Sequence, residues 1–176
     1  MNIALHDMSP FARDVALRLG LEAHPEGGWY TRDWQSEHLD ADSGHPLASL
    51  IYFLLPQGDA SAWHKVDADE IWLWHGPANV TLELGGFGTK PESNESRCER
   101  IVLGSGLSAA QVATPENGEN GSIDGTGKIG KTDSSTPIGH AIVPADCWQR
   151  TIPGVGDALV SCLVSPGFTF DGFTLE

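Results

Sequence analysis

Residues 58–76 read GDASAWHKVDADEIWLWHG, and the interpretation of the whole chain starts from this stretch. Its pattern predicts a strand over residues 61–66, a turn at 67–69 and a second strand over 70–75. Two short strands on either side of so short a turn are typical of a hairpin.

Side chains alternate across a strand, so each of the two strands has one face of its own. One face of the first strand carries Ala62, His64 and Val66, and one face of the second carries Glu70, Trp72 and Trp74. An imidazole and a carboxylate that flank one turn can converge on a small site, which makes this stretch the best candidate for chemistry. The alternative is a buried histidine–glutamate pair packed among aromatic residues.

The composition favours one globular domain over residues 1–176, because a chain of 176 residues can bury a sizeable core. Charged residues make up only 19%, and short apolar runs alternate with turns rich in the 21 glycines and 11 prolines. This pattern predicts an all-β sandwich or barrel. The formal net charge of −14 repels phosphate groups, so we expect no nucleic-acid or membrane partner.

Cysteine usage and the termini indicate a cytoplasmic protein. Cys98, Cys147 and Cys162 are odd in number and have no CxxC spacing, which disfavours a disulfide framework or a structural zinc site. Cys162 lies in the apolar run ALVSCLV and is expected to be core filling. The first residues show no basic leader followed by an apolar run, and no segment reaches membrane-spanning length.

The clearest helix is predicted at residues 8–20. Ser9 is suited to cap it, Pro10 suits its first turn and Gly20 ends it. Its apolar face is expected to consist of Phe11, Val15, Leu17 and Leu19.

Most of the remaining regular structure is predicted to be strands. The run ASLIYFLL at residues 48–55 is apolar on both faces, as expected of a central strand covered on both sides. In the strand at residues 29–36, Tyr30, Arg32 and Trp34 should share one face. Arg32 could bind an acidic group of a ligand, or pair with a nearby carboxylate. Further strands are predicted at residues 79–84, 100–104, 140–143, 147–152 and 158–168, and an edge strand or docked terminus at 168–176.

Residues 114–136 differ from the rest of the chain. They are rich in Gly, Ser, Thr, Asn and Asp and contain no aromatic residue. Such a segment cannot offset its ordering entropy by burial, so it is predicted to be a flexible surface insertion. Its glycines do not have the spacing of a phosphate-binding loop, and no apolar strand precedes them.

The stretch at residues 58–76 resembles the first cupin motif, G(x)5HxH(x)3,4E(x)6G. Gly58, His64, Glu70 and Gly76 stand close to the motif spacing, and Val66 takes the place of the second histidine. The second motif, G(x)5PxG(x)2H(x)3N, is echoed by GHAIVPADCWQR, in which Gln149 stands at the histidine position.

Four blocks in order carry a more specific resemblance, to a small cupin-like family described as a domain of unknown function. The blocks are HPEGGWYTRDWQS, IYFLLPQGDASAWHKVDADEIW, VPADCWQ and LVSCLVSPGFTFDGF. The resemblance covers the chain from about Pro10 onward, apart from residues 114–136. It implies a double-stranded β-helix, a jelly-roll barrel of two antiparallel sheets preceded by one helix. It also implies a homodimer, as in relatives that resemble sugar-nucleotide epimerases.

The resemblance raises the question of a metal, because standard cupins bind one through three histidines and a glutamate. The equivalent positions here hold His64, Val66, Glu70 and Gln149. Valine cannot coordinate a metal, and an amide oxygen suits hard cations better than softer ones. We therefore expect no required cofactor. A weakly bound divalent ion held by His64, Glu70 and Gln149 stays an open alternative.

Without a metal, the same residues suit acid–base chemistry. His64 could act as a general base, because histidine titrates near neutral pH, and Glu70 could orient it. Metal-free epimerases of the superfamily pair a histidine base with a tyrosine acid, and Tyr30 is our choice for that acid.

The predicted function is that of a cupin with a small-molecule pocket in its barrel. It would be an isomerase- or epimerase-like enzyme acting on a carbohydrate or another small polar substrate. A non-catalytic metabolite-binding cupin and a weakly metal-dependent enzyme are the alternatives. Ligand contacts are expected from Glu26, Arg32, Trp63, Trp148 and Gln149.

Overall fold

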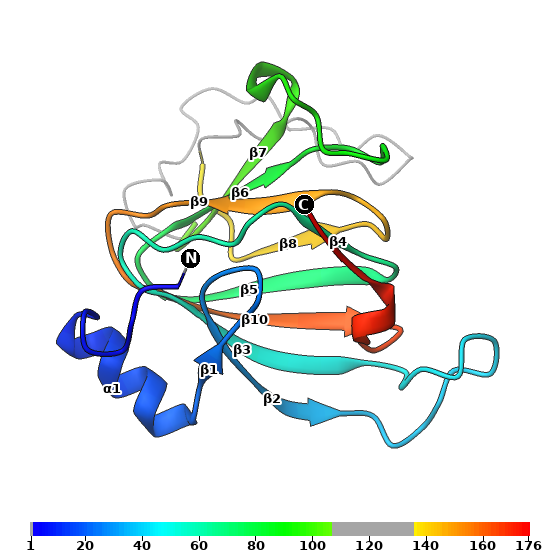
Figure 1. Cartoon of the computed structure of the whole chain (residues 1–176), viewed down its shortest axis with the longest axis horizontal. Coiled ribbons are helices and arrows are strands. Elements are labelled where there is room, and N and C mark those ends of the chain that lie inside the picture. Colours follow the sequence, from blue (N-terminus) through cyan, green and yellow to red (C-terminus); the bar gives the residue numbers. More distant parts are fainter. Residues whose placement is uncertain (1, 107–135) are drawn as a thin grey trace, which may run out of the picture.

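The computed structural model describes residues 2–106 and 136–176, and it forms two antiparallel sheets that face each other (Figure 1). Helix α1 spans Pro10–Leu19. The six-stranded sheet has the order β1-β2-β3-β10-β5-β8, and the five-stranded sheet the order β11-β4-β9-β6-β7. The predicted all-β jelly roll with one N-terminal helix is confirmed. The predicted insertion at residues 114–136 lies outside the described residues, except for residue 136.

The strands of the six-stranded sheet are β1 (Glu22–Ala23), β2 (Trp29–Gln35), β3 (Ser49–Leu55), β10 (Ala158–Ser165), β5 (Asp69–Pro77) and β8 (His140–Val143). Those of the five-stranded sheet are β11 (Phe173–Leu175), β4 (His64–Val66), β9 (Gln149–Ile152), β6 (Val80–Leu84) and β7 (Glu99–Leu103). Short 3₁₀ turns cover Glu95–Arg97 and Phe170–Gly172. The C-terminal strand β11 pairs with β4 at a sheet edge, which confirms the predicted edge strand.

The predicted hairpin at residues 61–75 is wrong, although its two strands exist. Strand β4 pairs with β9 and β11, whereas β5 pairs with β10 and β8. The two residues between them, Asp67 and Ala68, carry the chain from one sheet to the other. Alternation specifies which face of a strand is buried but not which strand is its neighbour. The face of β4 that carries His64 and the face of β5 that carries Glu70 are both buried, because the two faces lie opposite each other across the barrel.

Helix α1 begins and ends as predicted, but its buried face differs. The Ser9 hydroxyl accepts a hydrogen bond from the amide of Ala12, and Gly20 closes the helix in the left-handed conformation. Its most buried residues are the small side chains Ala12 and Ala16, whereas Phe11 and Leu17 are 45% and 64% exposed.

The helix packs on the outer face of the six-stranded sheet. Ala12, Ala16, Met8 and Leu21 cluster with Leu54, and Val15, Leu19, Trp29 and Tyr52 pack around them. Small residues allow the helix axis to approach the sheet closely. The strand at residues 48–55 is therefore covered on both sides at its Tyr52–Leu54 end, as its apolar pattern predicted.

A β-bulge in β2 changes which residues share a face. Tyr30 and Arg32 lie opposite Phe53 and Ile51, but Trp34 lies opposite Leu50, because the pairing register shifts at residue 33. The extra residue turns Trp34 to the other face of the sheet, away from Tyr30 and Arg32. The expected common face of these three residues is therefore wrong for Trp34.

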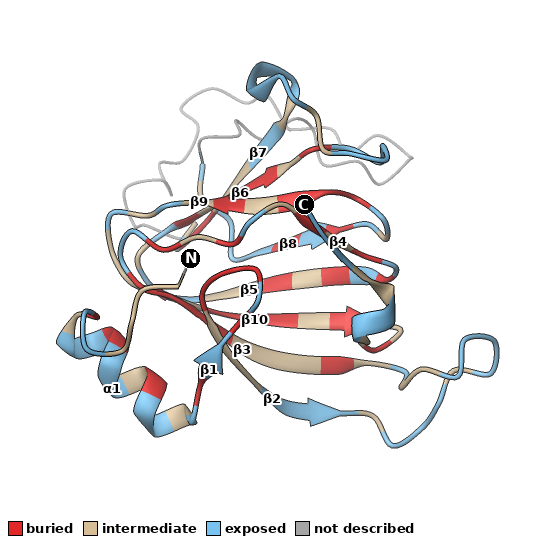
Figure 2. Cartoon of the chain, viewed as in Figure 1, coloured by how far each residue is buried: buried red, intermediate tan, exposed pale blue. Residues whose placement is uncertain are grey.

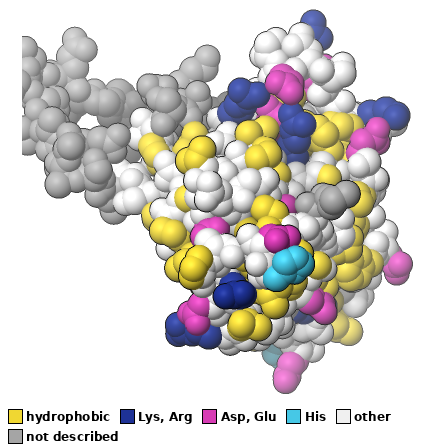
Figure 3. All heavy atoms as spheres, turned by 60° about the vertical axis from the view of Figure 1, so that its left-hand side comes forward, with side chains coloured by type: hydrophobic (Ala, Val, Ile, Leu, Met, Phe, Trp, Pro, Cys, Tyr) yellow, Lys and Arg dark blue, Asp and Glu magenta, His cyan; other side chains and the backbone are white. Residues whose placement is uncertain are grey.

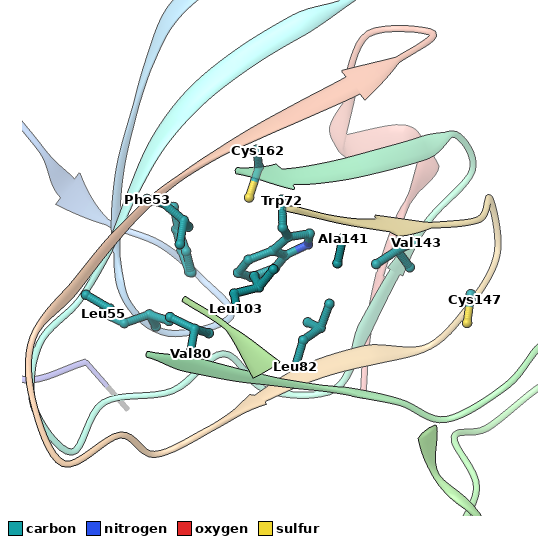
Figure 4. Packing of buried hydrophobic residues seen from close by; sticks show 12 residues of the cluster. Phe53, Leu55, Trp72, Val80, Leu82, Leu103, Ala141, Val143, Cys147 and Cys162 are labelled. Carbon is teal, nitrogen blue, oxygen red and sulfur yellow. The ribbon is translucent and has the colours of Figure 1, made fainter. Parts of the chain in front are cut away.

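The main core lies between the two sheets and consists of apolar side chains from both (Figures 2 and 4). Trp72 and Phe53 of the six-stranded sheet pack edge to face, with ring centroids 5.8 Å apart. Leu82 and Leu103 of the five-stranded sheet, both fully buried, close the core from the other side.

The outer surface is mixed in character. On the face of the described chain in Figure 3, basic side chains lie beside acidic and hydrophobic ones. Among the residues that the structure describes, no helix has the length and apolar character needed to cross a bilayer.

A buried core leucine and an exposed leucine of the helix should contribute very differently to the free energy of unfolding. We expect Leu82→Ala to lower the free energy of unfolding by about 2–5 kcal/mol, because Leu82 is fully buried and its loss leaves a cavity. Leu17→Ala, a matched substitution on the exposed side of α1, should change it by less than about 0.5 kcal/mol. Urea unfolding followed by circular dichroism measures both values. Equal losses in the two variants would contradict this assignment of buried faces.

Candidate functional site

A narrow cavity opens between the sheets at the end of the barrel where β4 meets β5. Its volume is about 30 Å³, which is room for about two water molecules. Most of its wall is apolar, with Ile51, Phe53, Val66 and Val164 among the lining residues. The ionisable groups in the lining are His24, Glu26, Tyr30, Arg32, His64, Glu70 and Cys162.

The carboxylate that faces His64 is that of Glu26. The Nε2 atom of His64 lies 3.3 Å from Oε2 of Glu26, and the two side chains are 3% and 7% exposed. Glu70 also lines the cavity, but it makes its hydrogen bonds elsewhere. The expected partnership of His64 with Glu70 is therefore replaced by one with Glu26.

Two glycines bring Glu26 to His64. Gly27 and Gly28 have positive φ angles of 114° and 70°, a conformation that favours glycine. A Cβ atom at Gly27 would lie 2.1 Å from the carbonyl oxygen of Ala60, so only glycine allows this approach. The carbonyl of Glu26 accepts a 2.7 Å hydrogen bond from the amide of Ala62. The β1–β2 loop is thus held against the segment that leads into β4.

Hydrogen bonding defines the proton positions on His64. Its Nδ1 atom lies 2.9 Å from the carbonyl oxygen of Ala62, and a carbonyl only accepts, so Nδ1 carries the hydrogen. The neutral ring therefore presents the lone pair of Nε2 to Glu26. The pKa of His64 is lowered to about 4, mainly by burial; the Ala62 hydrogen bond opposes this shift, and the nearby His24 adds to it.

His24 lies on the other side of the same carboxyl group. Its Nδ1 atom is 3.5 Å from Oε2 of Glu26 and accepts a weak hydrogen bond from the Glu26 amide at 3.4 Å. Burial lowers the pKa of His24 to about 4. Its ring packs edge-on against Tyr30, with centroids 4.5 Å apart.

Among these three side chains, the Glu26 carboxyl group is the one that favours the protonated form. Burial, and then the charge of Glu70, raise the pKa of Glu26 well above its ordinary value of 4.5. A protonated Glu26 can donate to Nε2 of His64, which has a free lone pair. One proton is therefore shared between Glu26 and His64, and His24 lies on the other side of the carboxyl group.

Glu70 is held in a different way. Its Oε2 atom accepts a 2.6 Å hydrogen bond from Nε2 of Gln149, and the thiol of Cys162 lies close enough to favour the charged form of the carboxylate. Burial raises the pKa of Glu70, while these two groups oppose the rise because they favour the charged form. Two carboxyl groups in different surroundings thus occupy one cavity, an arrangement typical of acid–base pairs.

The other predicted site residues divide into two groups. Tyr30 and Arg32 line the cavity, and the pKa of Tyr30 is raised by burial and by the neighbouring Glu22. Trp63 and Trp148 do not line it. Trp63 lies against the guanidinium of Arg150 at 4.6 Å, and the indole nitrogen of Trp148 donates to the carbonyl of Gly88.

Sequence reasoning did not select His24 or Cys162 as site residues. The signal for His24 was present in HPEGG, where a histidine stands two residues before Glu26 and close to a glycine pair. Cys162 gave no local signal, because its apolar neighbours are those of any core strand. Its site position follows from the alignment of β10 beside β5, where Cys162 lies opposite Trp72.

The fold and the sequence identify the family. The sequence profile of a family described as "Cupin superfamily (DUF985)" matches residues 13–176. The chain belongs to this family of cupins. The match runs from α1 to the last residue, in agreement with the four sequence blocks.

Solved structures are similar to this cupin over most of its length. A crystal structure from Shewanella oneidensis shares 30% sequence identity, with a TM-score of 0.67, and the alignment covers 93% of this chain and 82% of that one. A hypothetical protein from Leishmania major shares 24% identity, with a TM-score of 0.66 and coverage of 94% and 86%. No curated protein sequence matches the chain.

The cupin metal positions do not fit a metal in this chain. Val66 has no donor atom, and the Gln149 carbonyl oxygen already accepts a 2.9 Å hydrogen bond from the indole of Trp72. The Gln149 amide nitrogen is bound to Glu70. Among the described residues, no group of three or more His, Cys, Asp and Glu side chains is arranged to hold a metal ion. The role of Gln149 visible here is a hydrogen bond between the sheets.

The shared proton predicts a specific dependence of stability on pH. Above pH 4.5, folded Glu26 keeps a proton that the unfolded chain releases, so its contribution to stability falls as pH rises. The variant Glu26→Gln has no carboxyl group at this position, so it does not lose stability in this way as the pH rises. The stability of the variant relative to wild type should therefore rise between about pH 5 and pH 8, by up to ~1.4 kcal/mol per pH unit.

Urea unfolding at several pH values measures this difference. His24 and His64 act in the opposite direction, because their lowered pKa values remove stability as pH falls below 6.5. Both histidines are present in wild type and variant, so their effect largely cancels in the difference. Leu17→Ala, which changes no ionisable group, should give a difference that does not vary with pH. A flat difference for Glu26→Gln would show that Glu26 is ionised in the folded protein.

Proposed function

We propose that this cupin is an acid–base enzyme of the isomerase or epimerase type, acting on a small polar molecule whose reacting end enters the cavity. The observation that carries the proposal is the His64–Glu26 pair facing the same cavity as Glu70. These groups come from two different sheets and from the loop between β1 and β2. Groups that can give and take protons within one cavity are what a proton-transfer reaction at carbon requires.

The proposed reaction moves one proton off the substrate and another onto it. Glu70 accepts a proton from a carbon next to a carbonyl group, and the electron pair of the broken C–H bond moves into the carbonyl. The His64–Glu26 pair donates its shared proton to the enediolate that results. The enzyme then exchanges protons with solvent and regains its starting state. In the reverse direction Glu70 donates, and the His64–Glu26 pair serves as the base.

The apolar wall supports this assignment of roles. Water is largely excluded from a cavity of about 30 Å³, so electrostatic effects on a developing negative charge are strong there. Tyr30 lies beside His24 and interacts with Glu22, so we assign it to positioning the substrate and not to proton donation. Because the donor set at the cupin positions does not suit a metal, we propose that the reaction needs no tightly bound metal.

A non-catalytic binding role is the second candidate. It is favoured by the predominantly apolar lining, since apolar walls with a few polar groups are typical of ligand-binding sites in general. The two candidates differ in whether a bound compound exchanges hydrogen with solvent.

Hydrogen exchange tests the catalytic proposal even while the product is unidentified. Wild-type protein is incubated in D₂O with a panel of aldoses, ketoses, sugar phosphates and 2-hydroxy acids, and loss of C–H signals is followed by proton NMR. At least one compound should exchange, because a proton-transfer enzyme labels its substrate at the reacting carbon. His64→Asn and Glu26→Gln should each slow exchange by about 10²–10⁴-fold.

Three controls accompany this experiment. His38→Asn, on an exposed loop, should exchange like wild type. Exchange should persist in EDTA, and its loss there would favour the metal-dependent alternative. If panel compounds raise the melting temperature of wild type and His64→Asn equally, and none exchanges, the protein is a binding module.

We also propose a homodimer, as the family resemblance implies. The outer face of the six-stranded sheet supports it, because cross-strand neighbours form one apolar row. The row consists of Trp34, Leu50, Leu163, Ile71 and Ile142 on five adjacent strands. Trp34 and Ile142 are 50% and 57% exposed.

Light scattering after size exclusion should give twice the chain mass of 18.8 kDa. Ile142→Asp should shift the protein toward the monomer, because it places a charge in the apolar row. Val155→Asp adds the same charge at a loop residue that is 96% exposed and should leave the mass unchanged. A monomeric wild type would exclude the dimer, and an unchanged mass for Ile142→Asp would exclude this face.

A further inference from the structure

A second hollow, which the proposed reaction does not use, shares three lining residues with the cavity. An open basin of about 580 Å³ lies at the mouth, lined by Glu22, Thr31, Thr169, Phe170 and three residues shared with the inner cavity. The shared residues are Tyr30, Arg32 and Phe168. Ligand pockets are usually about 300–1,000 Å³, so the inner cavity is too small for a whole ligand and the basin is not. The body of a ligand would lie in the basin while one end reaches inward.

Arg32 is the cation at this junction, and within the described residues it has no carboxylate partner. It lies at the surface, and no Asp or Glu oxygen of the described chain is within 4.0 Å of its guanidinium. Every other described lysine or arginine except Arg13 has such a partner. In a chain with a formal net charge of −14, an arginine without a carboxylate partner at the mouth of a cavity is unusual.

The guanidinium of Arg32 is held in place by neutral groups. Nη1 donates to the side-chain oxygen of Gln35 at 3.1 Å, and Nη2 donates to the carbonyl of Phe168 at 3.4 Å. The guanidinium carbon also lies 5.9 Å from the centre of the Phe168 ring. Arginine has five N–H donors, so others stay available for a planar, two-oxygen acceptor such as a carboxylate or phosphate.

The other polar groups of the basin are consistent with an anionic ligand. Glu22 is the one carboxylate in its lining, and it lies near Tyr30, whose pKa it raises. The hydroxyl oxygen of Thr169 is buried and has no hydrogen-bond partner among the described residues. The exposed ring of Phe170 and the ring of Phe168 offer an apolar wall beside it.

We propose that Arg32 binds an oxyanion of the ligand, a carboxylate or a phosphate, at the junction of basin and cavity. The ligand is thus a small anionic molecule with its charged group in the basin and a slim end that enters the inner cavity. This inference rests on the proposed function for the role of the inner end, but binding at Arg32 does not depend on turnover.

Binding of matched charged and neutral probes tests the proposal. The probes are lactate with lactamide, and glycerol 3-phosphate with glycerol, measured by isothermal titration calorimetry at low ionic strength, where exposed charges are least screened. Wild type should bind lactate or glycerol 3-phosphate about tenfold to hundredfold more tightly than its neutral counterpart. Which of the two is preferred distinguishes a carboxylate from a phosphate ligand.

Variants then test whether the preference for the anionic probe depends on Arg32. Arg32→Gln should remove the preference for the anion, and Arg32→Lys should retain part of it, since lysine keeps the charge without the planar fork. Arg13→Gln makes the same charge change on the exposed side of α1 and should bind like wild type. Thermal melts confirm that each variant is folded.

The outcomes separate this inference from the proposed function. Anion binding that depends on Arg32, without hydrogen exchange in any panel compound, supports the anion site and contradicts the enzyme. Exchange that is unaffected by Arg32→Gln supports the enzyme and overturns the anion site. The anion site is also overturned if neither anion is preferred over its neutral counterpart, or if Arg13→Gln loses as much affinity as Arg32→Gln.

Discussion

The two sheets of this cupin are linked inside the barrel by a chain of buried hydrogen bonds. The indole of Trp72 donates to Gln149, and the amide of Gln149 donates to Glu70. Trp72 and Glu70 lie on β5 and Gln149 lies on β9, so the link crosses from one sheet to the other and returns. Each of these polar atoms is buried, and a buried polar atom without a partner is costly. The link therefore sets the positions of Glu70 and of the sheets around it.

The same link explains why the site differs from that of a metal cupin. The Gln149 side chain takes part in a hydrogen bond at both its oxygen and its nitrogen, and Val66 fills space beside His64. The ionisable groups that remain are held by one another and by the backbone. Burial shifts their pKa values in opposite directions, lowering those of the histidines and raising those of the carboxyl groups. The result is a neutral histidine–glutamic acid pair beside a carboxylate that hydrogen bonds favour in its charged form, which suits acid–base chemistry better than coordination.

Much of the fold could be predicted from the sequence, because the relevant signals are local. Alternation identified the buried faces of β4 and β5, and Ser9 and Gly20 marked the ends of α1. The hairpin at residues 61–75 was predicted wrongly because turn length and alternation do not specify the neighbouring strand. The face of Trp34 was wrong because a one-residue bulge leaves no clear mark in the sequence. The helix face was confirmed for Val15 and Leu19 but wrong for Phe11 and Leu17, because close packing placed the small side chains of Ala12 and Ala16 against the sheet.

For the site, the sequence by itself determined that His64 and Glu70 line the inside of a cupin barrel and that one metal ligand is missing. It could not determine which carboxylate faces His64. That was decided by the tertiary structure, in which Gly27 and Gly28 allow the loop carrying Glu26 to press against residues 60–62. Contacts between segments so far apart in the chain depend on the packing of both sheets. The positions of Cys162 beside Glu70 and of Arg32 between cavity and basin follow from the same packing, for which no local pattern exists.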